Sequence, residues 1–345
     1  MDKLVVGSMR RSAGKTSFIV GLIQALQKQK TFGYMKPFGD RLLYRKKRLW
    51  DYDSALIANI FGLKEDPENI TIAFEHSKIK YMYDEQATKE KLAEMAANTG
   101  EGKDVLLVEG GKDLTHGVSV YLDAVSVTTY LDGGLLLVIS GDEDSIIDDI
   151  TFVKKYVNMK DVNFKGVVIN KVQDIKDFTD IYVDTITEMG ITVLGVIPYE
   201  TELTYVSVGY LAEFLFAKVL AGENGLNNVA KNIFVGALSA NAALRNPLFS
   251  KEDKLIITGG DRTDMILAAL DSDTAGIVLT NNIVPPPTII SKAKDRGIPL
   301  LLVSFDTFQC AKKIDDLEPL VTKDDTEKIQ LLGNVVQEHV DIEEI

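Results

Sequence analysis

The sequence contains only one cysteine, Cys310, and only three histidines among 345 residues. One cysteine excludes an intramolecular disulfide, and so few histidines and cysteines exclude a zinc site of ordinary His and Cys spacing. No apolar run approaches the ~18 residues that suggest a membrane span. The N-terminus also lacks the basic region and long apolar stretch of a signal peptide. We therefore expect a cytoplasmic protein with no membrane segment.

Basic residues are outnumbered, because 38 lysines and arginines face 51 acidic residues and leave a net charge of −13. This balance argues against a general nucleic-acid binder, which needs a broad basic surface. From Asp315 to Ile345 there are 10 acidic and 2 basic residues, a net −8. We predict an acidic C-terminal helix or tail at residues 321–345. Two interpretations stay open: a solvated helix face or a segment that binds a partner.

The first two hundred residues alternate short β-branched runs with longer amphipathic stretches, which is typical of βα units around a parallel sheet. A second α/β pattern follows the Ile197-Pro198 pair. The predicted fold class is α/β: a parallel sheet with flanking helices at residues 1–203, then a smaller α/β domain at residues 204–320. Within these domains we predict single helices at Asp177–Met189 and Val208–Ala221, the latter ended by Gly222.

The strongest motif is a phosphate loop between the predicted strand Leu4–Gly7 and a helix that begins at Lys15. Gly14-Lys15-Thr16-Ser17 opens this helix, where glycine lets the backbone approach a phosphate and the helix N-terminus favours negative charge. Lys15 is expected on the β- and γ-phosphates, and the Thr16 hydroxyl on magnesium. Met9 occupies the position where the standard spacing has its first glycine, so the loop from Gly7 is two residues longer. This loop makes the predicted fold of residues 1–203 P-loop NTPase-like.

Further charged residues accompany this loop. Arg10 and Arg11 lie within it and are expected either to stabilise phosphate charge or to point to solvent. Glu109 ends a buried strand, where an acid reaches magnesium or caps a helix or loop. Asp51 and Asp53, which follow a basic run, are further candidates for an oxygen-rich magnesium shell.

Two lysine-containing dipeptides also follow predicted strands. Lys36-Pro37 comes after the second strand, at the sheet end where open α/β folds bind ligands. Lys36 is interpreted either as a catalytic cation in the cleft or as a surface residue. Asn170-Lys171 follows another strand, in the place where many phosphate-loop proteins recognise the base of the nucleotide.

The second domain has its own turn between a strand and a helix. Gly259 and Gly260 are expected to bring the backbone close to a ligand, and Asp261 to cap a helix that begins near Arg262. Asn281 ends the next strand on the same side of the predicted sheet. Convergence of two such strand-end loops is typical of a ligand crevice, although a tight turn with a helix cap explains the glycines equally well.

The two halves together resemble a known domain pair. The first half resembles the dethiobiotin synthetase-like phosphate-loop family and, more closely, the N-terminal domain of long-form phosphotransacetylases. The second half resembles the DRTGG domain. The matching segments are Gly7-Ser8, Gly14-Lys15-Thr16, Lys36-Pro37-Phe38-Gly39, Asp51-Tyr52-Asp53, Val108-Glu109-Gly110, Leu194-Gly195-Val196-Ile197-Pro198, Leu220-Ala221-Gly222-Glu223, Val235-Gly236-Ala237, Gly259-Gly260-Asp261-Arg262 and Val303-Ser304-Phe305-Asp306-Thr307.

This resemblance implies roles for several residues. It makes Lys15, Thr16, Asp53 and Glu109 nucleotide and magnesium residues, and it maps Lys36 onto a lysine that contacts the reacting phosphoryl group. The sequence also departs from the pattern. Asp264-Met265 replaces the glycine pair of DRTGG. Gly39-Asp40 stands where the synthetase has a small hydroxyl residue, which argues against the synthetase substrate.

Two functions remain open at this point. The first is a stand-alone, ATP–Mg²⁺- or ADP-binding regulatory or scaffold protein whose second domain binds a small molecule or a partner protein. The family's acetyl-transfer site lies in a further C-terminal domain that the printed sequence lacks, so we expect no acetyl transfer. The alternative is an ATP-dependent ligase or kinase that acts on a small carboxylate or carbamate. In either case related domains often dimerise, and we expect a homo-oligomer.

Overall fold

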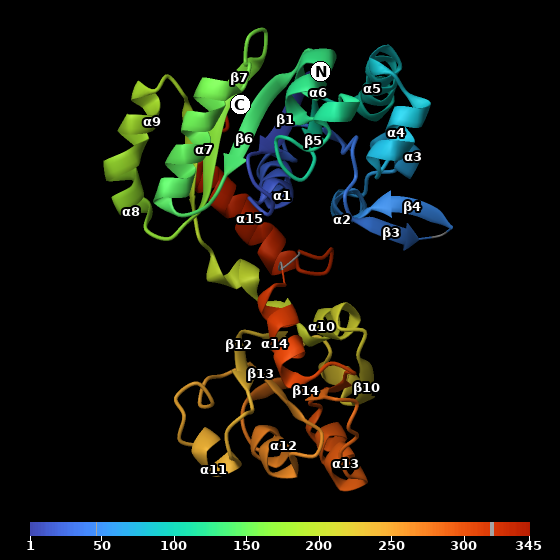
Figure 1. Ribbon diagram of the computed structural model, residues 1–345, viewed down its shortest axis with the longest axis vertical. Helices are drawn as coiled ribbons and strands as arrows, with labels where there is room; N and C mark the ends of the chain where they lie inside the picture. Colours follow the sequence, from blue (N-terminus) through green and yellow to red (C-terminus); the bar gives the residue numbers. More distant parts are fainter. Residues whose placement is uncertain (46, 318–320) are drawn as a thin grey trace. The chain divides into compact units, whose positions relative to one another are not determined.

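The computed structural model describes residues 1–45, 47–317 and 321–345 (Figure 1). It separates into a first unit, Met1–Glu200 with Val321–Ile345, and a second unit, Thr201–Leu320. Residues 321–345, predicted as an acidic C-terminal helix or tail, contain a helix at Thr326–His339 and group with the first unit. The predicted end of the second domain at residue 320 lies outside the described residues.

The first unit is built on a six-stranded parallel sheet in the order β2-β5-β1-β6-β7-β8. The strands β5 and β6 are buried along their whole length, as expected for a sheet covered on both faces. The six strands are β1 Asp2–Ser8, β2 Phe32–Met35, β5 Val105–Glu109, β6 Gly134–Ile139, β7 Asn163–Val172 and β8 Val193–Pro198. This arrangement confirms the predicted P-loop NTPase-like fold class.

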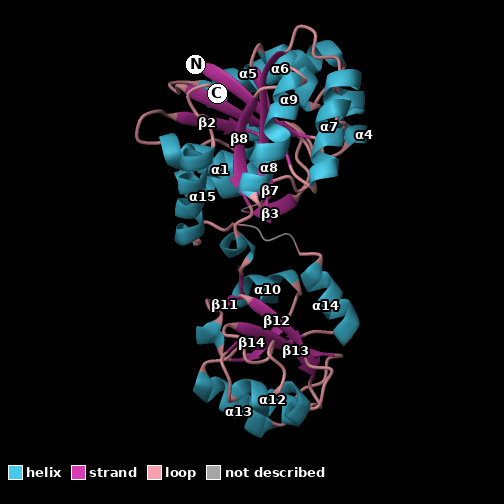
Figure 2. Cartoon of the chain, turned by 90° about the vertical axis from the view of Figure 1, so that its left-hand side faces the viewer, coloured by secondary structure: helices cyan, strands magenta, loops and turns pink. Residues whose placement is uncertain are grey.

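Helices cover both faces of this sheet. Figure 2 shows α1 and α15 on one side of it and α7 and α9 on the other. The helices are α1 Lys15–Leu26, α5 Glu85–Gly100, α6 Ala124–Leu131, α7 Glu143–Tyr156, α8 Ile175–Phe178, α9 Asp184–Glu188 and α15 Thr326–His339. A π-helical turn, η2 Thr179–Val183, joins α8 to α9, so the predicted helix at Asp177–Met189 is interrupted by a change of helical type.

The acidic C-terminal helix α15 packs along α1. A Cβ atom on Gly21 would lie 2.6 Å from the Leu332 carbonyl oxygen, and one on Gly333 would lie 2.6 Å from Gln24 Cγ. Val340, directly after α15, forms an antiparallel bridge with Gly195 of β8. Buried apolar residues such as Leu332 and Val336 line the inner face of the helix, whereas Glu327 and Glu338 are exposed.

A segment between β2 and α5 was not predicted in detail. An antiparallel hairpin, β3 Leu42–Arg45 and β4 Arg48–Asp51, leads directly into the helix α2 Tyr52–Phe61. The Asp51 carboxylate accepts hydrogen bonds from the backbone N–H groups of Asp53 and Ser54 and so caps α2. Three short elements complete this part of the unit: α3 Pro67–Ile70, α4 His76–Met82 and the 3₁₀ turn η1 Val118–Val120.

The second unit has a five-stranded sheet in the order β10-β15-β14-β13-β12, antiparallel only at β10. Its strands are β10 Lys218–Ala221, β12 Asn232–Val235, β13 Lys254–Gly259, β14 Thr274–Thr280 and β15 Leu300–Leu302. Its helices are α10 Val208–Phe214, α11 Ala240–Ala243, α12 Thr263–Leu270, α13 Pro287–Arg296 and α14 Thr307–Asp315. The small elements are β9 Val206–Ser207, β11 Val229–Ala230 and the 3₁₀ turns η3 Thr201–Thr204 and η4 Glu223–Gly225.

The predicted helix at Val208–Ala221 is wrong in its second half. The helix α10 ends at Phe214, Phe216 takes a φ of +50°, and Lys218–Ala221 pairs with β15 as an edge strand. Backbone pairing with an open sheet edge therefore prevails over the helical pattern of this sequence. Among the described residues, no helix is both long and apolar enough to cross a membrane.

Because α1 and α15 are in close contact, we expect a Gly→Ala substitution in α1 to destabilise the protein, the reverse of its usual effect in a helix. Gly→Ala inside a helix normally stabilises it by about 1 kcal/mol. We expect Gly21→Ala to destabilise the first unit by about 1–3 kcal/mol, because the added methyl group meets a backbone carbonyl. Thermal unfolding measures the difference. Ala97→Gly, at an exposed position of α5, is the control and should lose only the ordinary helix propensity. A raised melting temperature for Gly21→Ala would contradict the packing.

Candidate functional site

The phosphate loop connects β1 to α1, in the place where the sequence predicted it. Gly14 adopts a φ of +97° as the residue before α1, a backbone conformation that favours glycine. A Cβ atom there would also lie 2.2 Å from the side-chain nitrogen of Asn170. Gly7 is enclosed near the end of β1, with the Leu137 side chain 2.9 Å from its Cβ position. Both glycines are therefore needed for the shape of the loop.

Asn170 and Lys171, near the end of β7, contact the phosphate loop itself. The Asn170 amide donates a hydrogen bond of 2.8 Å to the carbonyl oxygen of Ala13. The Lys171 ammonium donates one of 2.7 Å to the carbonyl oxygen of Ser12, whose φ is +57°. These two residues, predicted to recognise a base, hold the backbone of the loop in this structure.

Lys15 is buried at the start of α1. Its ammonium donates hydrogen bonds to the Ser8 hydroxyl at 2.8 Å and to the carbonyl oxygen of Lys112 at 3.2 Å. Burial lowers the pKa of Lys15, although nearby carboxylates such as Glu109 oppose the shift. The cation is thus held between β1 and the segment after β5. Ser17, the other predicted loop residue, is half-buried in the first turn of the helix.

Thr16 and Glu109 are in direct contact. The Thr16 hydroxyl donates a 2.9 Å hydrogen bond to one oxygen of Glu109, and the Tyr34 hydroxyl donates one of 2.9 Å to the other. Burial raises the pKa of the Glu109 carboxyl, while the cation of Lys36 opposes the shift. Because Tyr34 is fully buried on β2, its hydroxyl is fixed by the sheet and orients the carboxylate towards Thr16.

Four carboxylates surround the buried ammonium group of Lys36. It lies 2.6 Å from Asp53, 2.8 Å from Asp40, 3.5 Å from Asp51 and 3.6 Å from Glu109. Only 2% of the Lys36 side chain is exposed. Burial disfavours its charge, but the carboxylates together raise the pKa of Lys36 well above its usual value. The interpretation of Lys36 as a surface residue is therefore wrong, and we call these five residues the lysine–acid cluster.

Arg41 joins the edge of this cluster. Its guanidinium lies 2.5 Å from the second oxygen of Asp53. Burial acts to raise the pKa of Asp53, but Lys36 and Arg41 outweigh it and hold that pKa below its usual value. Asp51 has a raised pKa, mainly through burial. The cluster therefore contains carboxylates with different tendencies to take up a proton.

The acids of this cluster also have the donor set that a hard divalent cation requires. Carboxylate oxygens of Asp40, Asp51 and Asp53 lie within 4.8 Å of one another, and they are the only such group among the described residues. All-oxygen donors suit Mg²⁺. The sequence prediction named Thr16, Asp53 and Glu109 for this metal. It also offered Asp51 as a further candidate for the magnesium shell, but it did not predict Asp40.

The two arginines of the loop face neighbouring acids. Arg10 makes a bidentate pair with Asp149 of α7, with N–O distances of 2.8 and 3.1 Å. Arg11 is 69% exposed and lies 3.8 Å from Asp113. The structure therefore places Arg10 against α7 and Arg11 largely in solvent.

In the second unit, Gly259 and Gly260 form the turn between β13 and α12. A Cβ on Gly260 would lie 1.7 Å from the Ile283 carbonyl oxygen, so the two strand-end loops do meet there. Arg262 donates hydrogen bonds to the backbone carbonyls of Gly236 and Leu238, at 3.5 and 2.7 Å. It therefore joins this turn to the segment after β12.

The expected helix cap by Asp261 is wrong. Asp261 is exposed, and α12 follows Arg262 without a side-chain cap. Asn281 takes a φ of +60° at the end of β14. Asp264-Met265, which stands in place of the glycine pair of DRTGG, has a structural role. The Asp264 carboxylate accepts a 3.4 Å hydrogen bond from the backbone N–H of Ala240, and Met265 is fully buried.

Fold and loop together define a P-loop NTPase-like domain followed by a second α/β domain. The family profile described as an AAA domain matches residues 2–207, and the profile of the DRTGG domain matches residues 210–317. The chain therefore belongs to the AAA-domain family of P-loop proteins and carries a DRTGG domain in its second unit.

Phosphate acetyltransferases are among its relatives. The Pseudomonas putida enzyme is 25% identical over 95% of this chain and 49% of its own length, and the Synechocystis enzyme is 25% identical over 100% and 51%. The chain thus spans about half the length of these relatives. This confirms the predicted relationship to the N-terminal region of long-form phosphotransacetylases.

Solved structures of low similarity were also found. The CBS and DRTGG domains of the Clostridium perfringens pyrophosphatase, complexed with diadenosine tetraphosphate, match with a TM-score of 0.30 and 18% identity over 52% of this chain and 80% of that one. MinD from Aquifex aeolicus matches with a TM-score of 0.37 and 16% identity over 59% of this chain and 84% of that one.

The lysine–acid cluster predicts an unusual response to magnesium. We expect Lys36→Met to destabilise the first unit by about 3–5 kcal/mol, because it leaves buried carboxylates without their cation. Magnesium should then raise the melting temperature of Lys36→Met more than that of the parent, since a bound ion stabilises the folded state.

Lys78→Met, at an exposed position of α4, serves as the control and should behave like the parent. Differential scanning calorimetry with and without magnesium measures both effects. Unchanged stability of Lys36→Met would contradict the role of this ammonium group.

Proposed function

We propose that the chain binds ATP or ADP with Mg²⁺ at the phosphate loop and acts as a nucleotide-responsive regulatory or scaffold module. The observation that carries the regulatory role is the enclosure of Lys36 by four carboxylates. Phosphoryl transfer needs cations directed at the transferring group. In this structure the candidate cation is the Lys36 ammonium, which faces carboxylates of the protein and is paired with them.

The nucleotide-binding part rests on the loop. The Gly14 backbone and the N-terminus of α1 suit phosphate oxygens, which helix N-termini favour through free N–H groups and the helix dipole. Lys15 is in place to contact the β- and γ-phosphates. Thr16, Glu109 and the carboxylates of Asp53 and its neighbours would hold Mg²⁺, which supplies positive charge for the phosphates when bound. Arg10, Arg11, Asn170 and Lys171 are proposed as further nucleotide contacts.

A second candidate function has one observation in its favour. Lys36 lies 3.6 Å from Glu109, which in turn contacts Thr16 of the phosphate loop, so the lysine is next to the proposed nucleotide site. If bound nucleotide and Mg²⁺ rearrange the acids, Lys36 becomes available to the γ-phosphate. The chain would then be an ATP-dependent ligase or kinase for a small carboxylate or carbamate.

The regulatory proposal assigns the second unit a ligand or partner. Its candidate residues are Gly259, Gly260, Asp261, Arg262 and Asn281, at the meeting point of two strand-end loops. We propose a cytoplasmic homo-oligomer without acetyl-transfer activity of its own. Sedimentation that shows only a 38.0 kDa species would contradict the oligomer, and acetyl transfer by the purified chain would contradict the proposed absence of that activity.

Nucleotide binding is tested by removing the loop lysine. We expect Lys15→Ala to lower the affinity for ATP–Mg²⁺ at least tenfold, or about 1.4 kcal/mol, because a cation on the phosphates is lost. Isothermal titration calorimetry measures this. Lys28→Ala, exposed just beyond α1, is the matched control and should bind like the parent. Equal affinities of folded Lys15→Ala and parent would refute the proposed site.

Phosphate release separates the two candidate functions. With ATP–Mg²⁺ and a panel of small carboxylates and carbamates, we expect tight binding without sustained turnover. The physical reason is that Lys36 stays paired with its acids. Steady release that a particular acid accelerates, and that Lys36→Ala abolishes without loss of nucleotide affinity, would replace the regulatory proposal by the ligase or kinase.

A further inference from the structure

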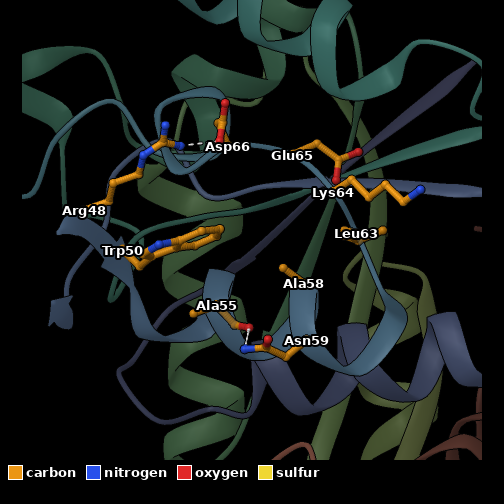
Figure 3. Close-up of a pocket in the computed structure, with 9 residues that line it drawn as sticks. All are labelled: Arg48, Trp50, Ala55, Ala58, Asn59, Leu63, Lys64, Glu65 and Asp66. Atoms are coloured by element: carbon orange, nitrogen blue, oxygen red, sulfur yellow. Dashed lines mark hydrogen bonds and ion pairs between the residues drawn. The ribbon is translucent and has the colours of Figure 1, made fainter. Parts of the chain in front are cut away.

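A cavity of about 350 Å³ lies beside α2, away from the phosphate loop. Residues of β4, of α2 and of the segment that follows α2 line it (Figure 3). The lining residues are Arg48, Trp50, Ala55, Ala58, Asn59, Leu63, Lys64, Glu65 and Asp66. Its volume falls in the range of small-molecule sites.

One wall of the cavity is aromatic. Trp50 is half-buried on β4, and Figure 3 shows its ring between α2 and the Arg48–Asp66 ion pair. Ala55 and Ala58 have short side chains, which leaves space over the helix next to the indole. An indole beside open apolar space offers a stacking surface for a flat molecule.

A polar wall stands beside it. The Oε2 atom of Glu65 is buried and has no hydrogen-bond partner among the described residues. A buried carboxylate oxygen without a donor costs free energy, so such groups normally find a partner. The other acid of this segment that lines the cavity, Asp66, is already paired with Arg48. Glu65 lines the cavity, and a rotation of its side chain that turns this oxygen towards the cavity would let a ligand N–H group satisfy the acceptor.

The cavity is separate from the proposed nucleotide site. Asn170 and Lys171 contact the phosphate loop from β7, whereas α2 follows the hairpin after β2. The strands β5, β1 and β6 lie between β2 and β7 in the sheet. A nucleotide whose base lies near Asn170 therefore leaves this cavity open.

We propose that this cavity is a second ligand site, which binds a planar molecule with N–H donor groups. The planar part stacks on Trp50, and an N–H group donates to Glu65. An amino-substituted heterocycle and a guanidinium group share this chemistry. The proposal does not depend on nucleotide binding at the phosphate loop.

Trp50 is the only tryptophan in the sequence, so its fluorescence reports directly on the cavity. The full chain is titrated with adenosine, with purine riboside, which lacks the amino group, and with agmatine, which carries a guanidinium. Calorimetry on the same samples detects binding that leaves the emission unchanged. We expect saturable binding of adenosine, and purine riboside should bind at least tenfold more weakly.

Glu65→Ala should weaken adenosine binding at least tenfold and remove the difference between adenosine and purine riboside. Glu68→Ala is the matched control, because Glu68 is 69% exposed, lies 3.8 Å from Arg48 and does not line the cavity. Circular dichroism confirms that both variants fold. Binding of agmatine in place of adenosine would support the site and identify the guanidinium as its ligand. The proposal would be overturned if neither adenosine nor agmatine bound, or if the ligand that binds had equal affinity for the parent and Glu65→Ala.

Discussion

Compensation of one buried ammonium group by four carboxylates is the constraint on which the first unit depends. Neither the lysine nor the acids would be stable alone at this depth, because isolated buried charges are strongly disfavoured. Lys36 comes from the end of β2, Asp51 and Asp53 from the start of α2, and Glu109 from the end of β5. The pairing therefore ties three segments together beside the phosphate loop. It also means that a metal ion or nucleotide phosphates must compete with existing ion pairs there.

The sheet explains why these groups meet. Parallel strands place their carboxyl ends at one edge, where β1 leads into the phosphate loop and β5 presents Glu109 to Thr16. The hairpin β3–β4 then returns the chain so that Asp51 caps α2 and receives the backbone N–H groups of Asp40 and Arg41, at 3.0 and 3.3 Å. The same hairpin carries Trp50. The charged cluster and the proposed second ligand site thus share β4 and α2, although they use different side chains.

Much of this architecture could be predicted from the sequence. The strands β5 and β6 are continuous apolar runs, which predict buried strands, and Gly14-Lys15-Thr16 at the start of a helix predicts a phosphate loop. The remaining features depend on contacts between distant residues. Arg10 and Asp149 are 139 positions apart, so no local sequence pattern predicts their pairing. Asp40 becomes a cluster member only once the hairpin folds. Lys218–Ala221 becomes a strand only because β15 offers a free edge. The acidic C-terminal segment joins the first unit through one apolar face, which its high charge made hard to predict from the sequence.

We propose that the phosphate loop binds nucleotide while the acids beside it hold Lys36 or magnesium. A crystal structure of the chain with ADP and Mg²⁺ at saturating concentration tests it most directly. We expect phosphate oxygens at the backbone of Gly14 and the start of α1, the Lys15 ammonium on a phosphate, and a metal ion coordinated by oxygen atoms near Thr16 and Glu109. An empty phosphate loop under these conditions, or nucleotide bound at another place in the chain, would contradict it.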